Sequence, residues 1–453
     1  MSLTPESQES LAYAHPAGVS VEAAHTARGW IASFVPWLMC SVGALFYFYE
    51  YLLRVAPSVM THELMLAYNI SATALGNLAA YYYYIYTPMQ LVVGVSMDRF
   101  GPRRLFTVAG VACALGSYLF AATPHLWVAQ IGRFLVGFGS AFAFVGVMKL
   151  ATIWLPPQKF ALVSGLTTTL GTVGGIVGNL LLTKWVAAHG WRSTSFITVI
   201  AGLVLTVFMF LTLRDGGKYQ HRLDVSHQES SFKSVFIGLF KIIRNPQIWV
   251  TGAIGCMMYI PTSAFAELWG NPYLQEVHHF SPQAAAQAIS MIFLGWAIGG
   301  PLMGWLSDRI YQRRLPMTIG SAFAALLLAV VLYVPGVSAH AIYVIFFVFG
   351  FFSSAQVIVF AVGREISPLR SAGTAIALTN MFVMIGGVLF QPLIGKVLDM
   401  FWSGQMANGV RLYSSSNFQL ALSILPLGLL LTVVISFFLR ETHCRVLNDD
   451  LTK

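Results

Sequence analysis

Charged side chains inside apolar stretches are the residues of this sequence best suited to chemistry. Glu50 and Arg54 lie four residues apart and therefore share one helix face, with Tyr47 on nearly the same face. Arg133 lies in another apolar stretch, and Glu50 is the partner that we expect for it. A charge at the centre of a spanning helix costs about 2.5–3.5 kcal/mol, which makes these residues functional candidates. A carboxylate that takes a proton and releases an arginine would form a proton-linked switch, whereas a permanent structural salt bridge explains the pair equally well.

Tyrosines and amides extend this candidate site. Five tyrosines among residues 81–86 lie too deep in an apolar stretch for an interfacial belt, and Tyr82 and Tyr86 are expected to line a cavity. Glu267 lies late in a later stretch, much as Glu50 does in the first, with Tyr259 eight residues earlier on the same face. Packing and hydrogen bonds between helices, with Arg54 snorkelling to the interface, are the competing explanation. The candidates for substrate binding and coupling are Tyr47, Glu50, Arg54, Tyr82, Tyr86, Arg133, Tyr259, Glu267, Gln356 and Asn380.

Motifs of other function classes are absent from the sequence. The four cysteines show neither metal-ligand nor disulfide spacing. Neither a phosphate-binding Gly-x-x-x-x-Gly-Lys-Ser/Thr loop nor a His-Glu-x-x-His metal motif occurs, so we expect no enzyme activity, no metal and no cofactor. The net charge of +9 comes from basic residues in short loops rather than one patch, which argues against a nucleic-acid partner.

The apolar stretches themselves must be membrane-spanning helices. Only 9% of the 453 residues are charged and 57% are hydrophobic, whereas a soluble domain carries about 25% charged residues. A spanning helix needs about 20 mostly apolar residues, and uncharged stretches of this kind recur along the chain. The longest, Leu315–Gly363, is divided by a turn around Pro335 and Gly336, which brings the expected number of spanning helices to twelve.

Loop charges predict how the chain is oriented and divided. Most lysines and arginines fall in loops on one side, which predicts that both termini lie in the cytoplasm. A polar, mixed-charge segment at the midpoint, expected to be partly helical near Phe232–Ile243, separates two halves of similar size. The expected parts are an N-terminal tail (1–29), a six-helix bundle (30–213), a cytoplasmic linker (214–246), a second six-helix bundle (247–439) and a C-terminal tail (440–453).

Each half carries a copy of the same loop between its second and third spans. The first copy reads Gly94-Val-Ser-Met-Asp98-Arg99-Phe-Gly101-Pro-Arg103-Arg104, and the second reads Gly304-Trp-Leu-Ser-Asp308-Arg309-Ile-Tyr-Gln-Arg313-Arg314. Such a repeat predicts two related halves. The glycine would let a neighbouring helix approach closely, and the aspartate could meet the nearby arginines. A basic loop that only sets orientation would not explain the matched glycine and aspartate.

The repeated loop resembles the signature of the major facilitator superfamily, although the second copy has Tyr311 in place of the middle glycine. The run from Arg133 to Gly139 and the Gly190-Trp191-Arg192 triplet are also similar to motifs of that family. The resemblance covers about residues 30–440. It implies an all-α membrane protein of twelve transmembrane helices in two pseudo-symmetric six-helix bundles, which rock about a site at the bilayer midplane. It also implies that Asp98 and the arginines around it form a cytoplasmic latch, with Asp308 in a weaker one.

These observations predict a secondary active transporter that imports a small polar solute by alternating access, coupled to H+. Amino acids, short peptides, nucleosides and organic anions are the candidate solutes, and the tyrosine, arginine and glutamate side chains suit a zwitterion or an anion. An exporter of drugs or siderophores is the alternative, and the glycines of residues 165–178 lack the Gly-Pro pair of antiporters, which counts modestly against it. A non-transporting membrane receptor or subunit is the alternative from another class. We expect a multi-pass monomer in a bacterial inner membrane, with lipid and a small-molecule substrate as its partners.

Overall fold

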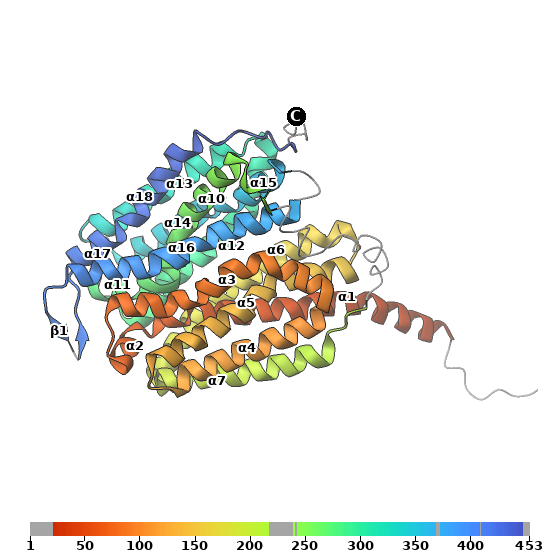
Figure 1. The fold of residues 1–453 in the computed structure, drawn as a ribbon, viewed down its shortest axis with the longest axis horizontal. Helices are drawn as coiled ribbons and strands as arrows, with labels where there is room; N and C mark the ends of the chain where they lie inside the picture. The colour runs from red at the N-terminus through yellow and green to blue at the C-terminus, as the bar shows by residue number, and fades with distance from the viewer. Residues whose placement is uncertain (1–20, 217–238, 241, 368–371, 408, 447–453) are drawn as a thin grey trace, which may run out of the picture.

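A computed structural model of the chain describes residues 21–216, 239–240, 242–367, 372–407 and 409–446, which are helical apart from short connections and one hairpin (Figure 1). The first half contains α1 (Val21–Val55), the 3-10 helix η1 (Ala56–Val59), α2 (Thr61–Tyr68), α3 (Ala72–Phe100), α4 (Pro102–Ala122), α5 (Leu126–Trp154), η2 (Pro157–Lys159), α6 (Phe160–Val177), the π-helix η3 (Gly178–Leu182) and α7 (Thr183–Thr212). The second half contains α10 (Pro246–Ile260), the π-helix η5 (Pro261–Trp269), α11 (Gly270–Val277), α12 (Pro282–Ile310), α13 (Arg314–Tyr333), α14 (Ala339–Ser353), η6 (Ser354–Val357), α15 (Ile358–Glu365), α16 (Ala372–Met400), the strands β1 (Met406–Ala407) and β2 (Val410–Arg411), α17 (Ser415–Leu422) and α18 (Ile424–Ser436).

Ten stretches of the described residues are long and apolar enough to cross a membrane. One of them, Leu162–Thr212, holds two crossings, because the chain turns inside α7 at Gly190. The φ of Gly190 is 78°, a left-handed conformation that costs glycine little. Helix α3 is the remaining crossing: its tyrosines make it less apolar, but its 29 residues are long enough to span a bilayer. The expected twelve spanning helices are therefore confirmed.

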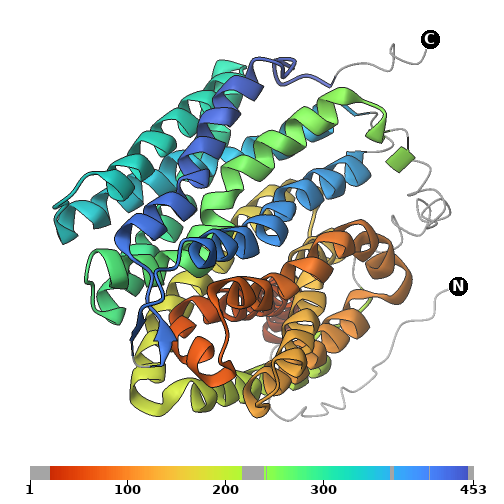
Figure 2. The same ribbon diagram turned by 60° about the vertical axis from the view of Figure 1, so that its left-hand side comes forward.

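The two halves lie side by side and pack along a shared boundary (Figures 1 and 2). Helix α3 of the first half packs against α16 of the second, and α6 packs against α12. The contact between α3 and α16 is close at Gly76, where an added Cβ would lie 2.5 Å from the carbonyl oxygen of Gln391. We call the end with the basic loops the inner end and the opposite end, where α3 begins, the outer end.

Replacing Gly76 by valine is expected to force α3 and α16 apart and open the outer end. The side chain would collide with the backbone of α16, which cannot give way as a flexible side chain would. A reporter cysteine at Ala72, a fully buried residue at the outer end of α3, should then react faster with a membrane-impermeant maleimide in a variant without the four native cysteines. Gly165→Val is the control, since a Cβ there meets nothing within 4 Å. Equal labelling of the two variants would contradict this role of Gly76.

Three parts of the fold differ from the expectation or lie outside it. Helix α1 begins at Val21, so the last residues of the expected N-terminal tail are helical. In the expected linker, residues 217–238 and 241 lie outside the described residues, while residues 239–240 and 242–243 are helical. The short hairpin of β1 and β2, which the all-α expectation did not include, pairs Met406 with Arg411 and follows α16 at the outer end. The five-part division of the chain stays a prediction.

Candidate functional site

The candidate site is a buried cluster of charged and phenolic side chains from both halves. Arg54 lies at its centre and donates from Nη2 to both carboxylate oxygens of Glu50, at 2.9 and 3.2 Å. Its Nε donates to the Tyr82 hydroxyl at 3.0 Å, and that hydroxyl donates to Glu50 Oε2 at 3.0 Å. The expected shared face of Glu50 and Arg54 is confirmed by these bonds. Glu50 is 0% exposed and Arg54 is 3% exposed, so the ion pair is shielded from solvent.

The second half contributes Glu267 and Tyr259 to the same cluster. Glu267 Oε1 lies 4.0 Å from Arg54 Nη1 and accepts a hydrogen bond from the Tyr259 hydroxyl at 3.4 Å. The hydroxyl of Tyr83, from the first half, also donates to the Glu267 carboxylate. Glu267 lies in η5, a π-helical segment that starts at Pro261, and such segments are frequent at functional sites. We call Glu50, Arg54, Tyr82, Tyr83, Tyr259 and Glu267 the central cluster.

The central cluster places two carboxylates around one guanidinium at the boundary between the halves. Aromatic rings fix that guanidinium in place: the Arg54 Cζ atom lies 4.4 Å from the Tyr51 ring centre and 5.1 Å from that of Tyr86. The two glutamates compete for one arginine, and removal of either partner of a buried ion pair is costly. A proton, a substrate anion or a shift of one half can therefore change which carboxylate the guanidinium holds.

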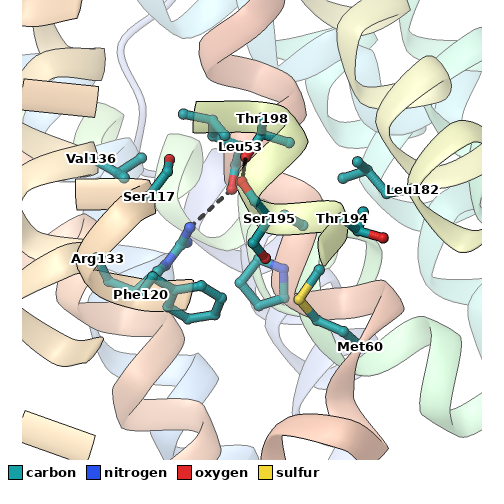
Figure 3. A pocket seen from close by; sticks show the side chains of 12 residues that line it. Leu53, Met60, Ser117, Phe120, Arg133, Val136, Leu182, Thr194, Ser195 and Thr198 are labelled. Carbon is teal, nitrogen blue, oxygen red and sulfur yellow. Dashed lines mark hydrogen bonds between the residues drawn. The ribbon is translucent and has the colours of Figure 1, made fainter. Parts of the chain in front are cut away.

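Arg133 does not pair with Glu50, contrary to the sequence-based prediction. Its Nη1 donates instead to the backbone carbonyl oxygen of Leu53 at 2.9 Å, as Figure 3 shows. That carbonyl needs a donor because Pro57, four residues later, has no N–H for a helical hydrogen bond. The Arg133 guanidinium also lies 5.3 Å from the ring centre of Tyr82. Arg133 is thus a neighbour of the central cluster and has no carboxylate partner among the described residues.

The remaining candidates lie outside the central cluster. Tyr47 is half-buried and its ring packs 5.8 Å from the ring of Tyr51. Asn380 donates to Gln90 Oε1 at 2.8 Å, which links the two halves nearer the inner end. Gln356 is buried in η6, where its Nε2 has no hydrogen-bond partner among the described residues. The structure therefore brings together five of the ten candidates, Glu50, Arg54, Tyr82, Tyr259 and Glu267, with Tyr86 and Arg133 at their edge.

Asp399 joins the two halves at the outer end, and sequence reasoning missed it. Its Oδ2 accepts from the backbone N–H and the hydroxyl of Thr73, at 2.8 and 2.5 Å. Its Oδ1 accepts from the hydroxyl of Tyr413 at 2.6 Å and from Arg411 at 3.1 Å. Because Thr73 lies in the first turn of α3, the carboxylate also faces the positive end of that helix dipole. The one available signal was an acidic residue late in an apolar stretch.

A second contact between the halves at the outer end consists of Ser58, Asn179 and Asn271. The Asn271 side chain of α11 donates from Nδ2 to Ser58 Oγ and to Asn179 Oδ1, both at 3.0 Å. Ser58 lies in η1 and Asn179 in η3, so all three residues belong to or adjoin interrupted helices. We call this triad and the Asp399 contacts the outer closure, because they tie the halves together where the molecule would open outward.

The repeated loops form ion pairs at the inner end, but not all those expected. Asp98 pairs with Lys149 of α5 at 2.7 Å rather than with the arginines around it, because α3 and α5 pack side by side. Arg103 instead donates from Nε to the carbonyl oxygen of Phe210 at 3.0 Å. In the second copy, Arg313 pairs with Asp308 and with Glu365 of α15, both at 2.6 Å. The latch role of these residues stays a prediction.

The glycines of the two loops differ in what they do. The prediction that Gly94 and Gly304 permit close helix packing is wrong in this conformation, since a Cβ at either position would meet nothing within 4 Å. Gly101 has a φ of 78°, and a Cβ there would lie 2.7 Å from a carboxylate oxygen of Asp215. That oxygen accepts a hydrogen bond from the backbone N–H of Arg103. Gly101 is therefore required by the turn and by this carboxylate.

Glu441, after the last helix, plays the corresponding part in the second half. Its carboxylate accepts hydrogen bonds from the backbone N–H groups of Arg313 and Arg314 at 2.8 and 2.9 Å, at the start of α13. Burial opposes ionisation of Glu441, but the backbone N–H groups that donate to it outweigh burial and hold the pKa of its carboxyl below the ordinary value. Each half thus uses a carboxylate that follows its last helix to cap the start of another helix. Asp215, after α7, caps α4, and Glu441, after α18, caps α13.

Glu441→Gln is expected to destabilise the folded protein at neutral pH by about 1 kcal/mol, a typical value for a helix N-cap. Since the pKa is lowered on folding, the stabilisation is present above the ordinary pKa of glutamate and is lost as the pH falls through the lowered value. Thermal unfolding in detergent at a series of pH values measures this. The melting temperatures of the wild type and the variant should differ at neutral pH and converge in acid; a constant difference would contradict it.

Comparison with known proteins agrees with this architecture. Residues 39–391 match the family model described as Major Facilitator Superfamily. The chain is 26% identical to the membrane sensor protein UhpC of Escherichia coli (strain K12), over 80% of this chain and 85% of UhpC. It is 23% identical to the probable hexose phosphate transport protein of Chlamydia pneumoniae, again over 80% of this chain and 85% of the relative. Its fold is similar to a crystal structure of the nucleoside transporter NupG, with a TM-score of 0.69, 13% identity, and coverage of 88% of this chain and 99% of NupG.

The family match covers most of the chain, and the twelve helices in two halves fit it. The sequence resemblance is confirmed, together with the expectation of a multi-pass membrane transporter rather than an enzyme. This chain belongs to the Major Facilitator Superfamily.

Proposed function

We propose that this transporter imports a small polar solute by alternating access and couples the import to protons. The observation that carries the proposal is the central cluster, in which Arg54 of the first half lies between Glu50 of its own half and Glu267 of the other. A buried charged cluster at the boundary of two moving halves responds to both a ligand and a proton. The cluster is also closed off toward the outer end by the outer closure, so the described conformation is one that faces inward or is occluded.

Proton coupling follows from the competition of two carboxylates for one guanidinium. When Glu50 takes a proton, its hold on Arg54 weakens and the guanidinium is free to bind an anionic group of a substrate. When the proton leaves toward the cytoplasm, Glu50 recovers Arg54 and displaces the substrate. This order makes solute and proton move in the same direction. It requires Arg54 to bind substrate and Glu50 to carry the proton.

Organic anions are the favoured class among the candidate solutes. Among the described residues, Arg54 is the arginine whose guanidinium contacts both halves. The planar fork of donors in a guanidinium can bind a carboxylate or a phosphate through two parallel hydrogen bonds. One relative is a probable hexose phosphate transport protein, and another is a probable sulfoacetate transporter. We also propose a monomer in a bacterial inner membrane, with its inner end in the cytoplasm. The basic loops at the inner end support this orientation.

Uptake by purified protein in liposomes tests this proposal. Panels of sugar phosphates, sulfonates, carboxylates, amino acids, peptides and nucleosides would be presented under an inward proton gradient, with protein-free liposomes as the control. At least one anionic solute should accumulate above its external concentration, and accumulation should stop when a protonophore collapses the gradient. Accumulation that persists without the gradient would contradict proton coupling.

A membrane sensor that binds a solute without transporting it is the second candidate. The similarity to the sensor UhpC favours this second candidate, because the alignment with UhpC extends over 80% of this chain. A sensor would show ligand-dependent thermal stabilisation with no uptake of the same ligand. A transporter would show both, so the two measurements on one ligand separate the candidates.

A further inference from the structure

Helix α1 is interrupted between two parts of the molecule that must respond to each other. Glu50 and Arg54 lie before the interruption, in the central cluster. Ser58 lies after it, in η1, and belongs to the outer closure. The interruption is caused by Pro57, which lacks the N–H that would bond to the carbonyl oxygen of Leu53.

Arg133 supplies the donor that Pro57 cannot. Its Nη1 donates to the Leu53 carbonyl oxygen at 2.9 Å, and the side chain is 4% exposed. A buried carbonyl without a donor costs about 1–3 kcal/mol, so this bond stabilises the interrupted form of α1. The Arg133 guanidinium also lies over the ring of Tyr82, which is part of the central cluster. One side chain from α5 therefore contacts both the interruption and the cluster.

The surroundings of Arg133 fit a positioning role better than a substrate-binding role. Arg133 points into a small cavity whose lining residues, from Leu53 to Thr198, all belong to the first half (Figure 3). The lining also includes hydroxyls of α7, such as that of Ser195, which donates to the carbonyl oxygen of Trp191 in its own helix. The Arg133 Nε–H has no partner in the described residues, and the cavity has room for about one or two waters. A solute between the halves would not occupy this cavity.

We propose that Arg133 is a positioning residue that holds the interruption of α1 and so couples the central cluster to the outer closure. Its bond to Leu53 fixes the direction of the chain from Arg54 to Ser58. Loss of the bond lets η1 move relative to the cluster, and the outer closure opens more often. The functional importance of the cluster rests on the proposed function, but the bond and its effect on the outer closure do not.

A double-mutant cycle between Arg133 and Pro57 tests this coupling. Arg133→Met removes the donor and keeps a side chain of similar length, and Pro57→Ala restores the missing N–H. Outward opening is followed as maleimide labelling of the Ala72→Cys reporter in a variant without the native cysteines, which needs no substrate. Arg133→Met should raise the labelling rate about tenfold with Pro57 present and less than about twofold in the Pro57→Ala background, because the carbonyl then has another donor.

Arg192→Met is the matched control. Arg192 also donates to backbone carbonyls in the first half, those of Ala121 and Thr123, but Pro57 does not leave those carbonyls free. Its effect on labelling should be the same with Pro57 present and in the Pro57→Ala background. Equal effects of Arg133→Met in the two backgrounds would overturn the proposal. So would unchanged labelling combined with a raised KM for a transported solute, which would make Arg133 a substrate ligand. Failure to find any transported solute leaves the labelling test intact and counts only against the proposed function.

Discussion

Arg54→Gln is expected to abolish uptake. The substitution leaves the Glu50 and Glu267 carboxylates buried with no guanidinium between them, and an unmatched buried charge of this kind costs about 3–5 kcal/mol. The variant also lacks the guanidinium that would hold the anionic group of the substrate. Loss of one partner of a buried charge pair weakens binding by about 2–5 kcal/mol, which predicts uptake at least about thirtyfold lower at a low solute concentration. Uptake per amount of correctly folded protein, judged by size-exclusion elution, is the measurement.

Arg54→Lys is the matched control for charge. Lysine keeps the positive charge but cannot donate to both Glu50 oxygens and to the Tyr82 hydroxyl in the fixed geometry that Arg54 has. We expect a folded protein with strongly reduced uptake, and better thermal stability than Arg54→Gln. If Arg54→Gln takes up solute at the wild-type rate, Arg54 does not bind the substrate.

Asp399→Asn is expected to make the outer end open more often, which is the second largest effect that we predict. The carboxylate accepts four hydrogen bonds, from Thr73 twice, Tyr413 and Arg411, and charged acceptors form the stronger bonds. The asparagine side chain has only one oxygen that can accept hydrogen bonds. Its NH2 group would face groups that are themselves donors, such as the Tyr413 hydroxyl and Arg411. The loss is on the order of 2 kcal/mol, which predicts about thirtyfold more frequent opening.

Labelling of the Ala72→Cys reporter measures this opening as well. Thr73→Val is the graded control, because it removes the hydroxyl donor but keeps the backbone N–H that also bonds to Asp399. Its effect should be smaller than that of Asp399→Asn and of the same sign. If neither variant labels faster than the wild type, Asp399 does not hold the outer end closed.

Local spacing along single helices was the most reliable guide from sequence to structure. Glu50 and Arg54 lie in one spanning segment, Tyr259 and Glu267 lie in another, and the spacing of each pair predicts a shared helix face. The structure adds a direct hydrogen bond within each pair. The repeat around Asp98 and Asp308 likewise gave the two halves. These features depend on helical periodicity and on the thickness of the bilayer, which are the same for every spanning helix.

Partners from different helices could not be predicted in the same way. Arg133 was expected to bind Glu50, but a nearer acceptor exists because Pro57 frees the carbonyl of Leu53. The proline was visible in the sequence, and applying the i to i−4 rule to it would have identified that acceptor. Asp98 and its partner Lys149 illustrate the other case, since their pairing depends on how α3 packs against α5.

The outer closure lay beyond sequence reasoning for a further physical reason. Asn179 and Asn271 are common polar residues within apolar stretches, and either could bond to its own helix. Only the meeting of η1, η3 and α11 shows that they bond across the two halves. Irregular helix segments of this kind have no strong sequence signature apart from the nearby proline and glycine residues.

The proton-carrying role of Glu50 at the centre of the boundary is tested most directly by comparing two modes of transport in Glu50→Gln. A glutamine preserves the shape of the side chain but cannot release a proton. In liposomes, the variant should still exchange labelled solute for unlabelled solute at equal pH, yet should fail to accumulate solute when an inward proton gradient is imposed. Accumulation by Glu50→Gln equal to that of the wild type would contradict the account.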